Sequence, residues 1–180
     1  MERNPYAPPS SVTDVAPEPP PPEGPAGLSG WLVVVAIGLF ITPLRLANYL
    51  WQTYPPLFRN GTWGVLTTPG PAPYHPFWGP LLIGEIAVNT LFILAAIYLL
   101  FSFFRKSRRF PHLYIVFLIS NLAFVLVDAL LVKIVLPEQP LLDSDTAREF
   151  GRSLVGAIIW IPYMLISRRV KNTFSGAYAP

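Results

Sequence analysis

Residues 80–104 read PLLIGEIAVNTLFILAAIYLLFSFF and contain a single charged side chain, that of Glu85. A run of this length can cross the hydrocarbon core of a bilayer as a helix, which needs about 20 apolar residues. A buried strand of a soluble protein is much shorter. The stretch therefore predicts a transmembrane helix, and the rest of the chain is interpreted outward from it.

Three further apolar stretches occupy residues 30–50, 112–136 and 150–167. Hydrophobic residues make up 52% of the 180 residues and charged residues 13%, compared with about 25% charged in soluble domains. In lipid the backbone must satisfy its own hydrogen bonds, which favours helices, and the sequence lacks the alternating pattern of β-barrel strands. We predict an all-α membrane protein, a four-helix transmembrane bundle within residues 28–175.

The segment before the bundle, residues 1–27, is rich in proline and includes the run Pro19–Pro22. Proline removes backbone donors and favours extended conformations, so we expect a disordered Pro-rich N-terminal tail. Its acidic residues outnumber Arg3 and it lacks an early apolar run, which argues against a cleaved signal peptide. A solvated spacer is the expected role, with recruitment of a proline-reading domain as the alternative. Residues 176–180 form the predicted C-terminal tail.

Basic residues are divided unequally between the two ends of the predicted bundle. With four crossings, the N-terminal tail, the 105–111 connection and the C-terminal segment share one side. That side carries eight lysines and arginines if Arg3 is counted, whereas the other carries four, mixed with four acidic residues. Because positively charged loops stay in the cytoplasm, both termini are predicted to be cytoplasmic.

The connection between the first two predicted helices, residues 52–79, is nearly uncharged and rich in aromatic residues. Tyrosine and tryptophan favour the headgroup region because their rings are amphipathic. We therefore expect a loop that lies against the outer membrane surface, with a partner-binding loop as the alternative.

Three ionisable residues fall inside the predicted helices: Arg45, Glu85 and Asp128. A rise of about 1.5 Å per residue places all three roughly 6 to 9 Å to the outer side of the midplane. An isolated charge there costs on the order of several kcal/mol, so the arginine is expected to pair with the two carboxylates. Asn89 and Asn121 lie on the same helix faces as these carboxylates and extend the layer. The first three helices are thus predicted to pack around an intramembrane polar layer.

This polar layer has two main interpretations. It is either structural, fixing how the helices pack, or part of a path for protons, ions or small solutes; contact with a partner is a third. Two carboxylates near one arginine leave one formal negative charge, which a proton can neutralise.

The sequence shows no pattern of a catalytic, cofactor or metal site. Without cysteine there are no disulfides, thiolate metal sites or cysteine nucleophiles. His75 and His112 fall on opposite sides of the predicted membrane and cannot share a metal. No paired carboxylates flank a cleft, and no phosphate loop or basic nucleic-acid motif is present. We expect a protein that is not an enzyme, has no cofactor and binds no nucleic acid.

Several short motifs lie in or directly beside the first and the last predicted helices. They are LSGWL at 28–32, PLR at 43–45, IWIPY at 159–163 and SRRVKNTF at 167–174. With these motifs the chain resembles the bacterial membrane family called domain of unknown function 2569, over about residues 28–175. The resemblance is most specific near the C-terminus, at Trp160, Pro162, Tyr163, Arg169 and Phe174. It implies a small four-helix protein of a bacterial inner membrane and no particular activity.

The function expected from these observations is that of a non-enzymatic accessory or scaffold component of a membrane assembly. Its partners would be the lipid bilayer and a membrane protein or a second copy of the chain. The alternative is a small permease or proton- or ion-conducting protein that uses Arg45, Glu85 and Asp128. A membrane-embedded enzyme ranks third.

Overall fold

The computed structural model describes residues 24–70 and 73–175, and this part of the chain is helical without a strand. The four long helices are α1 (Trp31–Arg59), α3 (Trp78–Phe104), α4 (Phe110–Val135) and α5 (Ser144–Ile166). Each is long and apolar enough to cross a membrane. The predicted all-α fold with four spans is confirmed, and the chain is a multi-pass membrane protein. The predicted tails, residues 1–27 and 176–180, lie outside the described residues except for residues 24–27, of which Gly27 is hydrogen-bonded to Thr173.

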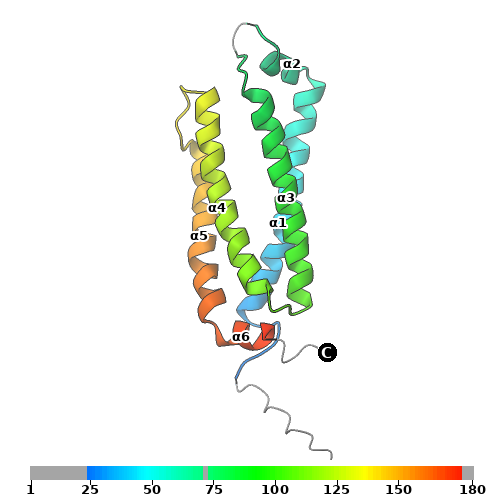
Figure 1. Ribbon diagram of the computed structural model, residues 1–180, viewed down its shortest axis with the longest axis vertical. Helices are drawn as coiled ribbons and strands as arrows, with labels where there is room; N and C mark the ends of the chain where they lie inside the picture. The colour runs from blue at the N-terminus through cyan, green and yellow to red at the C-terminus, as the bar shows by residue number, and fades with distance from the viewer. Residues whose placement is uncertain (1–23, 71–72, 176–180) are drawn as a thin grey trace, which may run out of the picture.

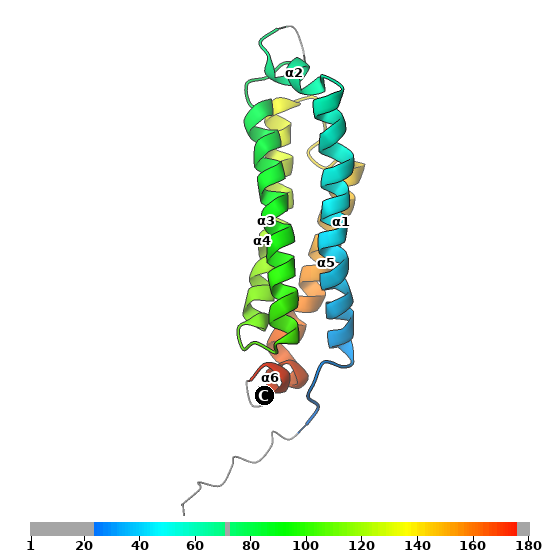
Figure 2. The ribbon, with the colours of Figure 1, turned by 90° about the vertical axis from the view of Figure 1, so that its right-hand side faces the viewer.

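The four long helices form two packed pairs, α1 with α3 and α4 with α5, and contacts between α3 and α4 join the pairs (Figures 1 and 2). The short helix α2 (Thr62–Thr67) lies at one end of the bundle. The short helix α6 (Arg168–Phe174) and residues 24–30 lie at the other. We call these the α2 end and the terminal end.

The first helix is longer than predicted, because α1 ends at Arg59 rather than at residue 50. It continues through Pro55 and Pro56, which lack the amide hydrogen that a helix interior uses and often end a helix. Tyr54, directly before them, is only 4% exposed. Burial of this large side chain favours the helical course despite the prolines. The predicted connection at 52–79 therefore begins inside α1 and also contains α2.

The fourth long helix also begins earlier than predicted, at Ser144 rather than at residue 150. The Asp143 carboxylate accepts a 2.8 Å hydrogen bond from the Thr146 N–H, which satisfies one of the free amides of the first turn. This hydrogen bond holds the pKa of Asp143 below its usual range. The polar residues that resembled a loop are thus the cap and first turn of α5, and Glu149 becomes a helix residue.

A buried core cluster of the described residues lies toward the terminal end. The Phe174 ring of α6 stacks on Phe110, with 4.8 Å between ring centroids, and lies 5.9 Å from Phe103. α6 therefore covers this end of the bundle. The buried core cluster consists of Leu32, Val35, Leu39, Leu99, Phe103, Phe110, Tyr114, Met164, Val170 and Phe174.

Candidate functional site: polar groups within the spans

Arg45 of α1 forms an ion pair with Glu149 of α5. Its Nη1 and Nη2 atoms each lie 2.9 Å from one carboxylate oxygen, a bidentate geometry that suits the planar guanidinium. The Arg152 guanidinium approaches the same carboxylate at 2.9 Å. Arg45 is thus paired with Glu149, not with Glu85 and Asp128, the partners expected from the sequence.

The partner carboxylate was missed because the predicted fourth helix started at residue 150, one residue after Glu149. The signal that locates it is the helix start at Asp143–Thr146, a short polar residue followed by a polar first turn. A helix that begins there carries Glu149 on its second turn.

The Glu85 carboxylate of α3 is bound to α1 instead. The Tyr49 hydroxyl donates a 2.6 Å hydrogen bond to Glu85 Oε1. The buried Tyr54 hydroxyl interacts electrostatically with Glu85 but has no hydrogen bond of ordinary geometry to a described residue. Asp128 of α4 also lies within electrostatic range of Glu85. We call these four residues, Tyr49, Tyr54, Glu85 and Asp128, the Tyr–Glu cluster.

The predicted polar layer is therefore divided into two parts. Arg45 joins α1 to α5, whereas the Tyr–Glu cluster lies among α1, α3 and α4. No basic side chain of residues 24–70 or 73–175 forms an ion pair with Glu85 or Asp128. The fourth long helix, which was not expected to contribute, supplies the partner of Arg45.

The two predicted amides have separate partners. Asn89, 6% exposed, donates a 2.9 Å hydrogen bond from Nδ2 to the backbone carbonyl of Glu85, within α3. Asn121 of α4 accepts a 2.9 Å hydrogen bond from the Ser153 hydroxyl of α5. Asn121 thus links two helices, while Asn89 satisfies its amide within its own helix.

The family-like residues of α5 contact the start of α1. The Trp160 ring lies edge-on to Trp31, with centroids 6.2 Å apart, and Tyr163 lies 5.8 Å from Trp160. Pro162 lies inside α5 and is exposed. The aromatic residues of the IWIPY motif therefore hold the terminal ends of α1 and α5 together.

The second C-terminal motif binds the segment that precedes α1. The Arg169 guanidinium donates to the Ser29 hydroxyl. The Gly27 N–H donates a 2.9 Å hydrogen bond to Thr173 Oγ1. With Phe174 in the core cluster, the motif segments near the two ends of the chain form one joint structure.

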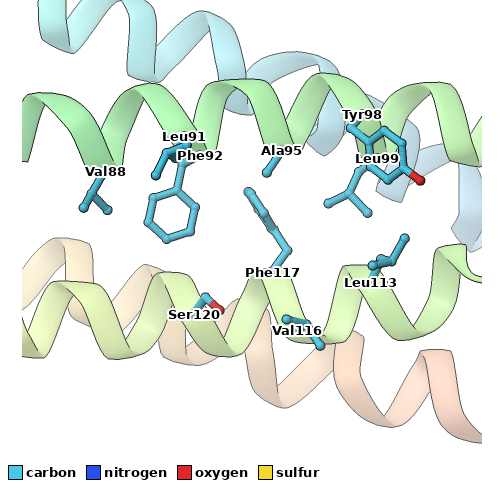
Figure 3. Close-up of a pocket in the computed structure, with 10 residues that line it drawn as sticks. All are labelled: Val88, Leu91, Phe92, Ala95, Tyr98, Leu99, Leu113, Val116, Phe117 and Ser120. Carbon is cyan, nitrogen blue, oxygen red and sulfur yellow. The ribbon is translucent and has the colours of Figure 1, made fainter.

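An apolar groove of about 330 Å³ lies between α3 and α4 (Figure 3). The Phe92 and Phe117 rings meet edge to face inside it, with centroids 5.6 Å apart. The remaining lining residues are Val88, Leu91, Ala95, Tyr98, Leu99, Leu113, Val116 and Ser120. The groove is separate from the Arg45–Glu149 ion pair, since neither residue lines it.

The arrangement offers phenol and carboxylate groups that can exchange a proton, but no arranged metal ligands. Among the residues that the structure describes, no group of three or more His, Asp or Glu side chains is placed to hold a metal ion.

Comparison with curated proteins and with solved structures found no match. A family model described as a protein of unknown function, DUF2569, matches residues 25–175. The matched region includes all four spans, α6 and the motif segments at both ends. As the resemblance of the motifs predicted, the chain belongs to the DUF2569 family.

Proposed function

We propose that this protein is a non-enzymatic accessory or scaffold component of a membrane assembly in a bacterial inner membrane. The observation that carries the proposal is the distribution of polar groups along the bundle. The ion pair of Arg45 and the Tyr–Glu cluster lie toward the α2 end, whereas the terminal end is filled by the apolar core cluster. A conducting path that used these groups would also have to pass the apolar core cluster to reach the terminal end.

The polar contacts within the spans connect neighbouring helices. Arg45 with Glu149 links α1 to α5, Tyr49 with Glu85 links α1 to α3, and the Asn121–Ser153 hydrogen bond links α4 to α5. Interhelical hydrogen bonds of this kind contribute on the order of 0.5–2 kcal/mol each in a membrane. A structural role therefore accounts for most of the polar groups, and the apolar helix faces are available to a partner helix.

The charge distribution supports a cytoplasmic terminal end. Seven of the basic residues, those at 105–109 and 168–171, belong to this end. All acidic residues of the described chain, from Glu85 to Glu149, belong to the half of the bundle toward the α2 end. By the positive-inside rule, this distribution supports a cytoplasmic location for both ends of the described chain.

The test is site-specific photo-crosslinking in native membranes, followed by purification in mild detergent. Leu94, Ile97 and Phe101 share an exposed face of α3, and Val155, Ile158 and Leu165 are exposed positions on α5. A scaffold is expected to give crosslinks to a stoichiometric partner or to a second copy on one helix face and not on the other. A monomer with no crosslinks, or with equal diffuse crosslinks on both faces, contradicts the proposal.

The second candidate function is a small permease or proton-conducting protein that uses Arg45, Glu85 and Asp128. It is favoured by the buried Tyr54 hydroxyl beside Glu85, and by two carboxylates that lack a basic partner among the described residues. In proteoliposomes this function predicts a proton flux that Glu85→Gln and Asp128→Asn abolish. Glu138→Gln, which changes an exposed carboxylate outside the spans, is the matched control. A flux with that pattern rejects the scaffold proposal, and no flux from the parent rejects the permease.

A further inference from the structure

We propose that the groove between α3 and α4 binds one acyl chain of an anionic phospholipid, whose phosphate is held by Arg105 and Arg109. This lipid site does not depend on the scaffold function and holds for either candidate function. The depth of the groove, its apolar lining and the cations at the connection between the same two helices support this site.

The groove has the depth of one leaflet. On α3 its lining extends from Leu99, near the connection to α4, back to Val88, which lies 16 residues before the helix end at Phe104. The lining itself, from Val88 to Leu99, covers 11 residues, which at 1.5 Å per residue is about 16 Å, and half of the hydrocarbon core is about 15 Å. An acyl chain that starts at the terminal end of the bundle can therefore lie in the groove along the full leaflet.

The lining suits a hydrocarbon chain with a polar head at one end. Its walls are almost entirely aliphatic and aromatic, and Ala95, the smallest side chain of the α3 wall, leaves room between the helices. The Tyr98 hydroxyl points along α3 toward the connection with α4 (Figure 3). The Tyr98 hydroxyl thus faces the region where headgroups lie, and the other hydroxyl of the lining, that of Ser120, lies farther along the groove.

The connection between α3 and α4 carries four cations that form no ion pair with a residue of 24–70 or 73–175. Residues 105–109 read RKSRR, and none of their basic side chains forms an ion pair or hydrogen bond with a described residue. The described chain has no acidic residue at this end that could neutralise them. A loop of unpaired cations at the membrane interface attracts anionic headgroups.

Two of these cations continue the faces that line the groove. Arg105 lies seven residues, about two turns, after Tyr98, and Arg109 lies one turn before Leu113. Arg108 lies in the connection before the N-cap of α4, five residues before Leu113, and so does not share the one-turn spacing of Arg109 and Leu113. A phosphate at the mouth of the groove can accept bidentate hydrogen bonds from the two guanidiniums at 105 and 109.

The test is native mass spectrometry of the purified full chain, titrated with dioleoyl phosphatidylglycerol or with dioleoyl phosphatidylcholine, which share the same acyl chains. The parent is expected to bind one phosphatidylglycerol more tightly than phosphatidylcholine. The double substitution Arg105→Gln with Arg109→Gln is expected to weaken phosphatidylglycerol binding about 10- to 30-fold. The double substitution Arg108→Gln with Lys171→Gln removes the same charge from the same end and is expected to retain most of the affinity.

Groove filling tests the acyl chain separately. Ala95→Phe is expected to weaken the binding of both lipids, because the phenyl ring occupies the space of the acyl chain. Ser120→Leu obstructs the groove less and serves as the second variant if Ala95→Phe does not fold. Equal affinity of the parent for the two lipids, or equal losses in the two double variants, overturns the proposal. So does a dimer of the parent that Ala95→Phe converts to a monomer without changing lipid binding, since the groove would then be an interface between copies.

Discussion

At the residue scale, the bidentate ion pair of Arg45 and Glu149 connects α1 with α5. The two side chains are 39% and 34% exposed, so the pair is neither fully buried nor a surface contact. Glu149 would retain only Arg152 if Arg45 were neutralised. Asp128 differs, because the described residues provide it with neither an ion pair nor a hydrogen bond.

We predict that Arg45→Gln lowers the free energy of unfolding by about 1–3 kcal/mol, between the values for exposed and buried pairs. Asp128→Asn is the matched control and is expected to leave stability unchanged or to raise it, because a charge without a partner is removed from the spans. Thermal unfolding in the same detergent measures both. Equal stability of Arg45→Gln and the parent contradicts the structural role of the pair.

At the scale of the elements, two helix boundaries depend on features that the hydropathy of the sequence does not predict. α1 passes through Pro55 and Pro56 because Tyr54 is buried beside them, and α5 starts at Ser144 because Asp143 caps it. Hydropathy places a boundary where apolar residues end, whereas a real helix continues into polar residues whose free amides are satisfied. This extra turn and a half of α5 supplies Glu149.

The Asp143 cap predicts a pH dependence of stability. The hydrogen bond with Thr146 lowers the folded-state pKa of Asp143. The stability that the ionised carboxylate contributes is therefore fully present above the unfolded pKa of about 3.9, and it is lost as pH falls through the folded pKa. The difference in melting temperature between the parent and Asp143→Ala is expected to shrink as pH is lowered through this range.

Asp143→Asn is the control for this pH effect. Asparagine caps helices well but does not titrate, so its advantage over Asp143→Ala is expected to stay constant with pH. If the difference in melting temperature between the parent and Asp143→Ala stays constant with pH, ionisation of the carboxylate contributes nothing to stability.

At the scale of the whole molecule, the two ends of the bundle differ in charge and in packing. The terminal end combines the apolar core cluster, the joined motif segments and seven basic residues. The α2 end holds the acidic residues of the described chain. The proposed cytoplasmic orientation of the terminal end is inferred from this asymmetry in charge.

We predict that single cysteines at the two ends label from opposite sides of the membrane. The chain contains no cysteine, so Gln139→Cys and Ser175→Cys can be compared without background. In intact spheroplasts a membrane-impermeant maleimide is expected to label Gln139→Cys at once and Ser175→Cys only after permeabilisation. The reverse pattern contradicts the positive-inside assignment.

The sequence by itself determined the fold class, the four spans and the family. These are predictable because a transmembrane helix satisfies its own backbone hydrogen bonds, so its presence depends on local length and apolarity. The motifs LSGWL and SRRVKNTF likewise identified the family from short segments. Glu85 and Asp128 were correctly placed inside the spans for the same local reason.

Only the tertiary structure decided which polar groups meet. Arg45 and Glu149 are 104 residues apart, and Ser29 and Arg169 are 140 apart; their meeting depends on which helices are neighbours and how far each extends. Depth along a helix is a one-dimensional property that the sequence carries, whereas the pairing of side chains also requires the rotation of each helix and its position around the bundle. The rotation and the position of each helix depend on the packing of large side chains such as Tyr54 and Phe174. This packing is determined jointly by residues that lie far apart in the chain.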